Sequence, residues 1–201
     1  MSSGVPAGAR AAVVTVSDRA ARGDYADRSG PVLAAGLAQL GFTVAAPVIV
    51  PDERERIVAA LRGALAAGAD LVVTTGGTGL APRDVTPEAT AAVLDREVPG
   101  LAEALRAAGR TKVPTAALSR GLAGTTGRAL VVNLPGSTGG VRDGLAVLGA
   151  VVGHALDQLR GGDHRPAPDG DQQPAPGGDQ QAVPGGSQQP RGSGHEPGPH
   201  R

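Results

Sequence analysis

The stretch VVTTGGTGLAPRDVTPEAT, residues 72–90, joins the end of an apolar strand to an alanine-rich helix through a loop with three glycines. Apolar and β-branched residues fill 69–75 without regular alternation, which is typical of a central parallel strand buried on both faces. Thr86 before Pro87 predicts a helix start, with Thr86 as N-cap and Pro87 in the first position. The stretch therefore indicates a strand–loop–helix unit of an α/β fold.

Strand and helix patterns alternate along the rest of the domain. Further strands are expected at residues 10–16, 42–50 and 128–136, and helices at 29–41, 52–68, 97–109 and from about 138. Pro47 places the second of these strands at a sheet edge or a bulge. Asp52 and Glu55 have capping-box spacing, so Asp52 is expected to cap its helix. The alternation predicts a three-layer α/β/α domain with a mainly parallel sheet.

The two ends of the chain differ in composition from its middle. Residues 161–201 are rich in Gly, Pro and Gln and contain the tandem octapeptides PDGDQQPA, PGGDQQAV and PGGSQQPR. Such a segment cannot bury enough apolar surface to offset the entropy of ordering, so we expect a disordered tail. Residues 1–9 are expected to be a flexible lead. Residues 10–160 then form one domain of ordinary size.

Composition argues against several classes of function. The formal net charge is zero, so bulk electrostatics favour neither nucleic acid nor an anionic membrane as partner. Tyr25 and Phe42 are the sole aromatic residues, too few for a base-stacking surface, and the chain has no cysteine. His154, His164, His195 and His200 do not have the spacing of metal ligands. Without an apolar run of membrane-spanning length or a signal pattern, a soluble cytoplasmic protein is expected.

Polar or glycine-rich segments directly follow four of the expected strands. They are residues 17–19, 51–53, 74–79 and 134–137. The carboxyl ends of parallel strands lie at one edge of a sheet, where open α/β sheets bind their ligands. We therefore expect these four segments to converge on one site.

The glycine loop allows two interpretations. Gly76, Gly77 and Gly79 permit positive φ angles and leave N–H groups uncovered, which would suit an anion, and Thr75 and Thr78 add hydroxyl donors. The loop matches neither the phosphate-binding P-loop nor the dinucleotide fingerprint. The alternative is a tight turn that needs glycine for steric reasons alone.

The polar residues around this loop are equally open to two interpretations. Arg83 and Asp84 could form a local ion pair or an Asx turn, or could bind a phosphate and a metal ion respectively. Asp52 and Ser137 could be simple helix caps. The helix start behind Ser137 would also attract an anion.

The order of these motifs resembles a known family. TTGGTG followed by RDVTPEAT, with SDRAARGDYADRSGP upstream and LPGS downstream, is similar to the MoaB/Mog family of molybdenum cofactor biosynthesis over almost all of 10–160. VIVPDERERI and PTAALSR add to the match, and PDE resembles the Mog branch. The resemblance implies a molybdopterin adenylyltransferase, which joins molybdopterin to AMP from Mg-ATP and releases pyrophosphate. It also implies a homotrimer that acts before a molybdenum-inserting enzyme. A non-catalytic molybdopterin carrier is the alternative.

The resemblance also implies roles for individual residues. The two acidic positions of the family fall on Asp52 and Asp84, as catalytic residues and ligands of Mg²⁺. The substrate-binding positions fall on Ser17, Asp18, Thr75, Gly76, Gly77, Thr78, Gly79, Ser119, Pro135, Gly136 and Ser137. One departure is visible, because the family often has Pro-Lys where this chain has Thr138 and Gly139. Arg142, one helical turn further, is a candidate for the missing positive charge.

Overall fold

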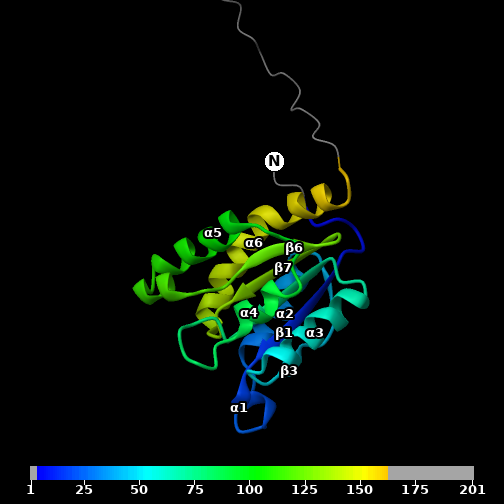
Figure 1. The fold of residues 1–201 in the computed structure, drawn as a ribbon. Coiled ribbons are helices and arrows are strands. Elements are labelled where there is room, and N and C mark those ends of the chain that lie inside the picture. The colour runs from blue at the N-terminus through cyan, green and yellow to red at the C-terminus, as the bar shows by residue number, and fades with distance from the viewer. Residues whose placement is uncertain (1–3, 163–201) are drawn as a thin grey trace, which may run out of the picture. The chain divides into compact units, whose positions relative to one another are not determined.

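A seven-stranded, mainly parallel sheet forms the centre of the protein in the computed structural model, which describes residues 4–162 (Figure 1). The sheet order is β2-β1-β4-β7-β6-β5, and β3 also pairs with β1. The parallel strands are β1 (Arg10–Val16), β2 (Thr43–Val44), β3 (Val48–Val50), β4 (Leu71–Thr75) and β7 (Ala129–Leu134). The antiparallel strands are β5 (Arg96–Glu97) and β6 (Ala123–Thr126). Residues 1–3 of the expected lead, and the expected tail from residue 163 with its three histidines, lie outside the described residues.

Helices cover both faces of the sheet. α2 (Ser29–Gln39), α5 (Pro99–Arg110) and α6 (Thr138–Leu159) pack on one face, and α3 (Arg54–Ala66) and α4 (Thr86–Ala91) on the other. The short α1 (Asp18–Ala21) and the 3₁₀ helix η1 (Pro114–Leu118) lie in connections. This arrangement confirms the predicted three-layer α/β/α fold. Among the described helices, none combines the length and the apolar character needed to cross a bilayer.

The central strands place apolar side chains on both faces. In β4, Leu71 and Val73 join the core under α2, α5 and α6, whereas Val72 joins the core under α3 and α4. In β7, Leu130 joins the first of these cores and Val131 joins the second. All of them are nearly or fully buried. This two-sided burial explains why the sequence of a central strand shows no alternation.

The edges of the sheet differ from the sequence prediction. The strand expected at 42–50 is split into β2 and β3, and Pro47 lies in the break, at the edge where it was predicted. The β5–β6 pairing was not predicted, and α5 begins at Pro99 because Glu97 belongs to β5. The prediction that Asp52 caps α3 was wrong. The N-cap of that helix is Glu53, and the Asp52 carboxylate accepts a hydrogen bond from the Asp18 N–H instead.

A buried asparagine joins the two central strands to α4. The Asn133 Nδ2 donates to Thr74 Oγ1 at 3.0 Å and to Thr90 Oγ1 at 2.9 Å, and its Oδ1 accepts from the Leu122 N–H at 3.0 Å. Asn133 is 4% exposed, so solvent cannot replace these partners. Buried polar groups of this kind rigidify a core only when every partner is present.

Asn133→Ala is expected to lower the free energy of unfolding by about 2–4 kcal/mol, because it leaves buried partners unsatisfied and opens a small cavity. Urea denaturation gives this value. The matched control is Gln39→Ala on the exposed side of α2, which removes a solvated amide and should change stability by less than about 0.5 kcal/mol. Equal effects of the two variants would contradict the structural role of Asn133.

Candidate functional site

The strand order reverses between β1 and β4. After β1 the chain forms β2 and β3 on one side of that strand, and then crosses through α3 to β4 on its other side. The segments that follow β1 and β4 therefore diverge at a topological switch point. Crevices beyond the carboxyl ends of such strands are the usual ligand sites of open α/β sheets.

The glycine loop after β4 is tightly enclosed. Gly76 has φ +103°, and a Cβ there would lie 2.3 Å from the Val16 carbonyl oxygen at the end of β1. Gly77 has φ +62°, and a Cβ there would lie 2.4 Å from Thr86 Oγ1. These contacts confirm the steric interpretation of the glycines at both positions. The Gly76 N–H donates to the Leu134 carbonyl oxygen at 3.1 Å, so the prediction that it is uncovered was wrong. Ligand binding by the Gly77 N–H stays a prediction.

Thr86 does not have the predicted role of helix N-cap. α4 has Val85 as its N-cap, so the prediction of Thr86 as N-cap was wrong. The buried Thr86 hydroxyl donates to the Gly76 carbonyl oxygen at 2.9 Å. It therefore fixes the glycine loop against the helix that follows.

Two carboxylates lie directly on the glycine loop. Asp52 Oδ1 would be 3.1 Å from a Cβ at Gly77, and Asp84 Oδ2 would be 2.9 Å from a Cβ at Gly79. Glycine at these positions leaves room for both acids. Asp84 Oδ2 also accepts from the Ala81 N–H at 2.9 Å, which holds it within its own turn.

Asp18 and Asp52 hold each other through their backbones. The Asp18 N–H donates to Asp52 Oδ2 at 2.7 Å, and the Asp52 N–H donates to Asp18 Oδ1 at 3.0 Å. Burial of the Asp52 carboxyl raises its pKa, and the neighbouring charges of Asp18 and Asp84 raise it further. A cation at this position would relieve that excess of negative charge.

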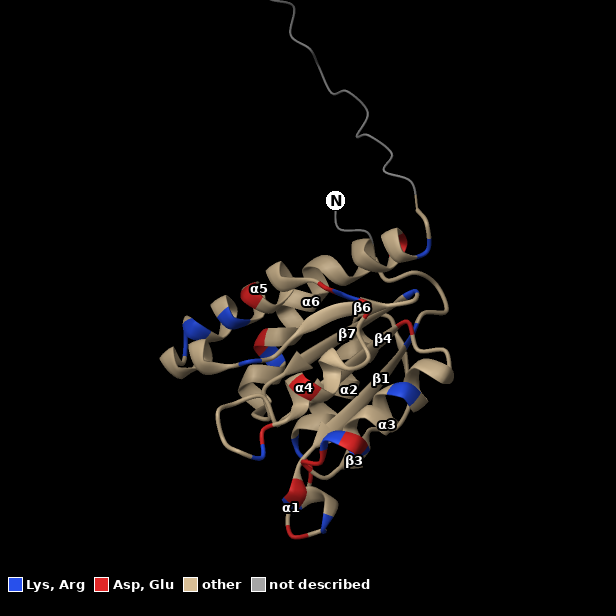
Figure 2. Ribbon diagram, in the orientation of Figure 1, with Lys and Arg blue, Asp and Glu red and all other residues tan. Residues whose placement is uncertain are grey.

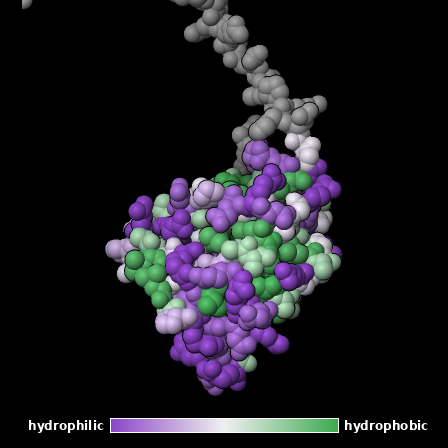
Figure 3. All heavy atoms as spheres, viewed as in Figure 1, coloured by the Kyte–Doolittle hydropathy of each residue, from purple (hydrophilic) through white to green (hydrophobic). Residues whose placement is uncertain are grey.

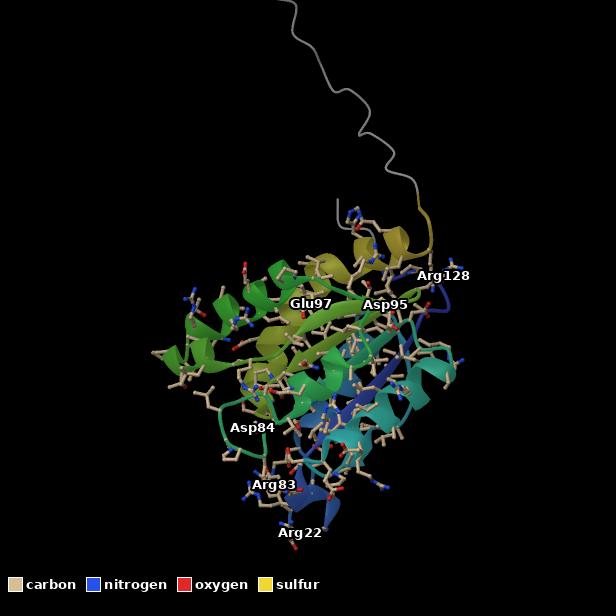
Figure 4. All side chains as sticks on the ribbon, in the orientation of Figure 1. Arg22, Arg83, Asp84, Asp95, Glu97 and Arg128 are labelled. Atoms are coloured by element: carbon tan, nitrogen blue, oxygen red, sulfur yellow. The ribbon has the colours of Figure 1, made fainter. Side chains whose placement is uncertain are left out.

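Arg83 pairs with Asp18 and not with its neighbour Asp84, so the local ion pair considered for Arg83 and Asp84 does not form. Its Nε and Nη2 donate to Asp18 Oδ2 and Oδ1 at 2.6 and 2.8 Å. This bidentate contact lowers the pKa of Asp18. Figure 4 places Arg83 between Asp84 and Arg22 in that view, and Figure 2 shows acidic and basic residues gathered at the end of the domain that carries α1 and β3. The surface there is hydrophilic (Figure 3).

Two cavities adjoin at the start of α6. The carboxylate cavity, of about 520 Å³, is lined by predicted site residues from the ends of β1, β3, β4 and β7: Ser17, Asp18, Asp52, Thr75, Gly76, Gly77, Asp84, Gly136 and Ser137. The α5–α6 cavity, of about 360 Å³, is lined by the remaining ones, Thr78, Gly79, Ser119, Pro135 and again Ser137, together with residues of α5, η1 and α6. Every predicted site residue thus lines one of these cavities, and Ser137 lines both.

Several of these hydroxyl groups shape the site through internal hydrogen bonds. Ser17 caps α1 and accepts from the Ala20 N–H at 3.3 Å. Ser137 caps α6, as predicted, and accepts from the Gly140 N–H at 3.1 Å. Thr75 is fully buried, and its hydroxyl donates to the Pro135 carbonyl oxygen at 2.8 Å, which ties the end of β4 to the loop after β7.

Arg120 is a site residue whose task the sequence did not reveal. Its Nε donates to the Gly79 carbonyl oxygen at 2.7 Å, and its Nη2 donates to the Asp84 carbonyl oxygen. Its Nη1 pairs with Glu88 of α4, and this contact lowers the pKa of Glu88. Arg120 therefore holds the loop that carries Asp84. In the sequence, Arg120 is marked only as the last residue of the motif PTAALSR, which matches the family.

A cation could be held by Asp52 and Asp84 at the glycine loop. Across residues 4–162, no group of three or more Asp, Glu, His or Cys side chains converges to hold a metal ion. Mg²⁺ does not need such a group, because it usually takes one or two carboxylates and completes its shell with water and substrate phosphates. The residues present therefore fit a cation that arrives with a phosphorylated substrate.

The fold defines a switch-point α/β domain with two adjoining cavities, one of which is lined by carboxylates. Residues 12–154 match a family model described as a probable molybdopterin binding domain. The molybdopterin adenylyltransferase of Pyrococcus furiosus is 39% identical over 153 residues, which cover 74% of this chain and 89% of that protein. The chain therefore belongs to the molybdopterin-binding family of molybdenum cofactor biosynthesis, as the sequence resemblance predicted.

Longer relatives and solved structures agree with this assignment. A molybdenum cofactor biosynthesis bifunctional protein of Synechococcus elongatus is 45% identical over 161 residues, and the match covers 80% of this chain and 50% of that protein. The chain thus spans half the length of that relative. The molybdopterin biosynthesis Mog protein of Mycobacterium ulcerans has 52% identity and a TM-score of 0.72, with 76% of this chain and 99% of that chain covered. The tungsten cofactor synthesizing protein MoaB of Pyrococcus furiosus has 37% identity and a TM-score of 0.71, with 78% and 99% covered.

Proposed function

We propose that this protein is a molybdopterin adenylyltransferase, which transfers AMP from Mg-ATP to molybdopterin and gives adenylylated molybdopterin and pyrophosphate. The observation that carries the proposal is the meeting of an acidic and a largely apolar cavity at the Ser137 cap of α6. Relatives named molybdopterin adenylyltransferase, at 39–42% identity, support it. They do not favour the alternative of a non-catalytic carrier.

The two cavities suit the two substrates. The α5–α6 cavity has apolar walls and a volume of about 360 Å³, which fits the flat ring system of molybdopterin. The carboxylate cavity suits the triphosphate of ATP together with a divalent cation. The terminal phosphate of molybdopterin would then lie at the start of α6, between the cavities. Ser137 Oγ accepts from the Gly140 N–H, so the N–H groups of the residues before Gly140 in the helix can bind that anion.

The proposed transfer makes one bond and breaks one bond. A phosphate oxygen of molybdopterin attacks the α-phosphorus of ATP, and the bond from that phosphorus to the bridging oxygen of the β-phosphate breaks, so pyrophosphate leaves with the electron pair. The chain contributes by holding two mutually repelling anions in line, through the N–H groups at the start of α6 and the Gly77 N–H. Mg²⁺ held by Asp52 and Asp84 would neutralise phosphate charge.

Other parts of the proposal concern the setting of the enzyme. We place it in the cytoplasm as a homotrimer that passes its product to a molybdenum-inserting enzyme. The family resemblance supports these statements. The zero net charge agrees with substrates that are small molecules and not nucleic acid or membrane.

The proposal predicts that product forms only when ATP, molybdopterin and Mg²⁺ are all present. Purified protein should convert molybdopterin to its adenylylated form, and omission of any one component should reduce the rate to background. Chromatography of the pterin products measures this directly. A carrier would bind molybdopterin with the same affinity in the presence or absence of ATP and would form no product, and that result would overturn the proposal.

A further inference from the structure

The rim of the α5–α6 cavity carries an ion pair that the proposed transfer chemistry does not use. Asp143 of α6 accepts a hydrogen bond from the ammonium group of Lys112, which is the single lysine of the chain. Both residues line the cavity. The Asp143 side chain is 15% exposed, whereas that of Lys112 is 68% exposed. The carboxylate is therefore built into the cavity wall, and the lysine reaches it from the surface.

One oxygen of this carboxylate is available. Lys112 bonds Oδ1, and within residues 4–162 no donor bonds Oδ2. Because the Asp143 side chain is mostly buried and lines the cavity, a ligand donor that enters the cavity could bond Oδ2.

The rest of the cavity wall offers surface for the faces of a ring. Leu105, Ala116 and Leu134 contribute apolar side chains. Gly139 leaves the wall open, because a Cβ there would meet nothing within 4 Å. A flat heterocycle between such walls would have its faces covered by apolar groups. Its polar edge would then have to be satisfied by the charged residues at the rim, as in most sites for small ligands.

We propose that Asp143 and Lys112 recognise the aminopyrimidinone edge of the pterin ring. The exocyclic amino group and the adjacent ring N–H of that edge are two neighbouring donors. Oδ2 of Asp143 can accept from one of them, and the second lone pair of Oδ1 can accept from the other. The carbonyl oxygen next to them can accept from the Lys112 ammonium. This inference rests on the proposed function, since it concerns the pterin half of molybdopterin.

The same pair would help to keep the two substrates apart. The adenine edge presents its amino donor next to a ring nitrogen that accepts, so it cannot offer two neighbouring donors to Asp143. Adenine in this cavity would place its ring-nitrogen acceptor against the Asp143 carboxylate. Two acceptors would then face each other without a proton between them, which is unfavourable. Asp143 is thus a specificity residue that directs the pterin to the α5–α6 cavity.

The test compares two stable ring compounds, pterin and lumazine, by fluorescence titration. In lumazine a carbonyl replaces the exocyclic amino group, so one of the two donors is lost. Wild-type protein should bind pterin more tightly than lumazine by about 10-fold or more, the effect of one hydrogen bond to a charged group. Asp143→Asn should weaken pterin binding by about 10–100-fold and bring the ratio of the two affinities close to one.

Lys112→Gln tests the lysine, and its melting temperature should stay that of the wild type, which separates it from loss of structure. Asp157→Asn is the matched control for Asp143→Asn. Lys112→Gln should weaken both compounds to the same degree, because both keep the carbonyl oxygen next to the ring N–H. Asp157→Asn makes the same chemical change on the same helix without lining the cavity and should leave both affinities unchanged. General loss of structure would weaken pterin and lumazine alike and would leave their ratio intact.

The outcomes also separate this inference from the proposed function. If Asp143→Asn keeps the preference for pterin, or if wild-type protein shows no preference, the assignment of Asp143 is wrong, whereas adenylyl transfer can still be observed. If wild-type protein forms no adenylylated product, the proposed function fails independently of the ring-binding result.

Discussion

Asp52→Asn is expected to slow the transfer of AMP to molybdopterin by about 10²–10³-fold, as does the loss of one charge-stabilising group in other enzymes. Asparagine keeps an oxygen that can accept from the Asp18 N–H, so the local backbone should be retained. It removes the negative charge that would hold Mg²⁺ beside the glycine loop. Initial rates at saturating ATP measure the effect. Asp24→Asn, which changes an exposed partner of Arg22, is the control and should keep wild-type rates.

The same substitution should raise the melting temperature at neutral pH. Burial, and then the charges of Asp18 and Asp84, raise the pKa of Asp52 above 3.8 in the folded state. The folded state therefore binds this proton more tightly than the unfolded state does. The stabilisation from protonation is complete below the unfolded pKa and is lost as the pH rises through the folded pKa. At neutral pH the wild-type protein bears the cost of a partly buried, ionised Asp52.

Differential scanning calorimetry in the absence of divalent cations tests this stability effect. Each kcal/mol recovered by Asp52→Asn should raise the melting temperature by about 2–4 °C. The advantage over wild type should shrink as the pH is lowered toward 3.8. A variant that is less stable than wild type at neutral pH would show that the Asp52 charge stabilises the fold, which would contradict this prediction.

Gly76→Ala should cause the largest loss of stability. A Cβ at Gly76 would lie 2.3 Å from the Val16 carbonyl oxygen, which is backbone and cannot move without separating β1 from β4. The φ of +103° adds strain for any residue with a side chain. We expect a loss of at least about 4 kcal/mol, a large part of the stability of an ordinary domain. The carboxylate cavity lies over this junction, so activity should be lost as well.

Gly127→Ala separates the steric contact from backbone strain. Gly127, in the turn between β6 and β7, has φ +54°, but a Cβ there would meet nothing within 4 Å. This control should cost about 1–2 kcal/mol, the cost of a left-handed conformation alone. Urea denaturation of both variants gives the comparison. Similar losses at the two glycines would contradict the close approach of the glycine loop to β1.

The fold could be predicted because its strongest signals are local. Leu71–Thr75 and Ala129–Leu134 are short apolar runs that end in glycine or proline loops, and each is followed by a helix with a recognisable start. Parallel strands bring such loops to one edge, which is why the predicted site residues after these strands line one of the two cavities. Ser119, which also lines a cavity, follows η1 instead. The β5–β6 pairing could not be predicted from the sequence. β5 has two residues, and the AGTT of β6 offers no apolar pattern.

The details that could not be predicted depend on partners far apart in the chain. Arg83 lies next to Asp84 in sequence but pairs with Asp18, which is 65 residues away. Asp52 has capping-box spacing, but its carboxylate is taken by the Asp18 N–H from another strand end. The division of the site into two cavities was also not foreseen. It arises because α5 and η1 pack beside the start of α6, and no short motif encodes that packing.

Adenylyl transfer is tested most directly with ATP labelled at the α-phosphate, incubated with molybdopterin, Mg²⁺ and the purified protein. The label should move into the pterin product, whereas label placed at the γ-phosphate should leave as pyrophosphate. Label from the γ-phosphate in the pterin, or no label in the pterin from either position, would contradict adenylyl transfer by this protein.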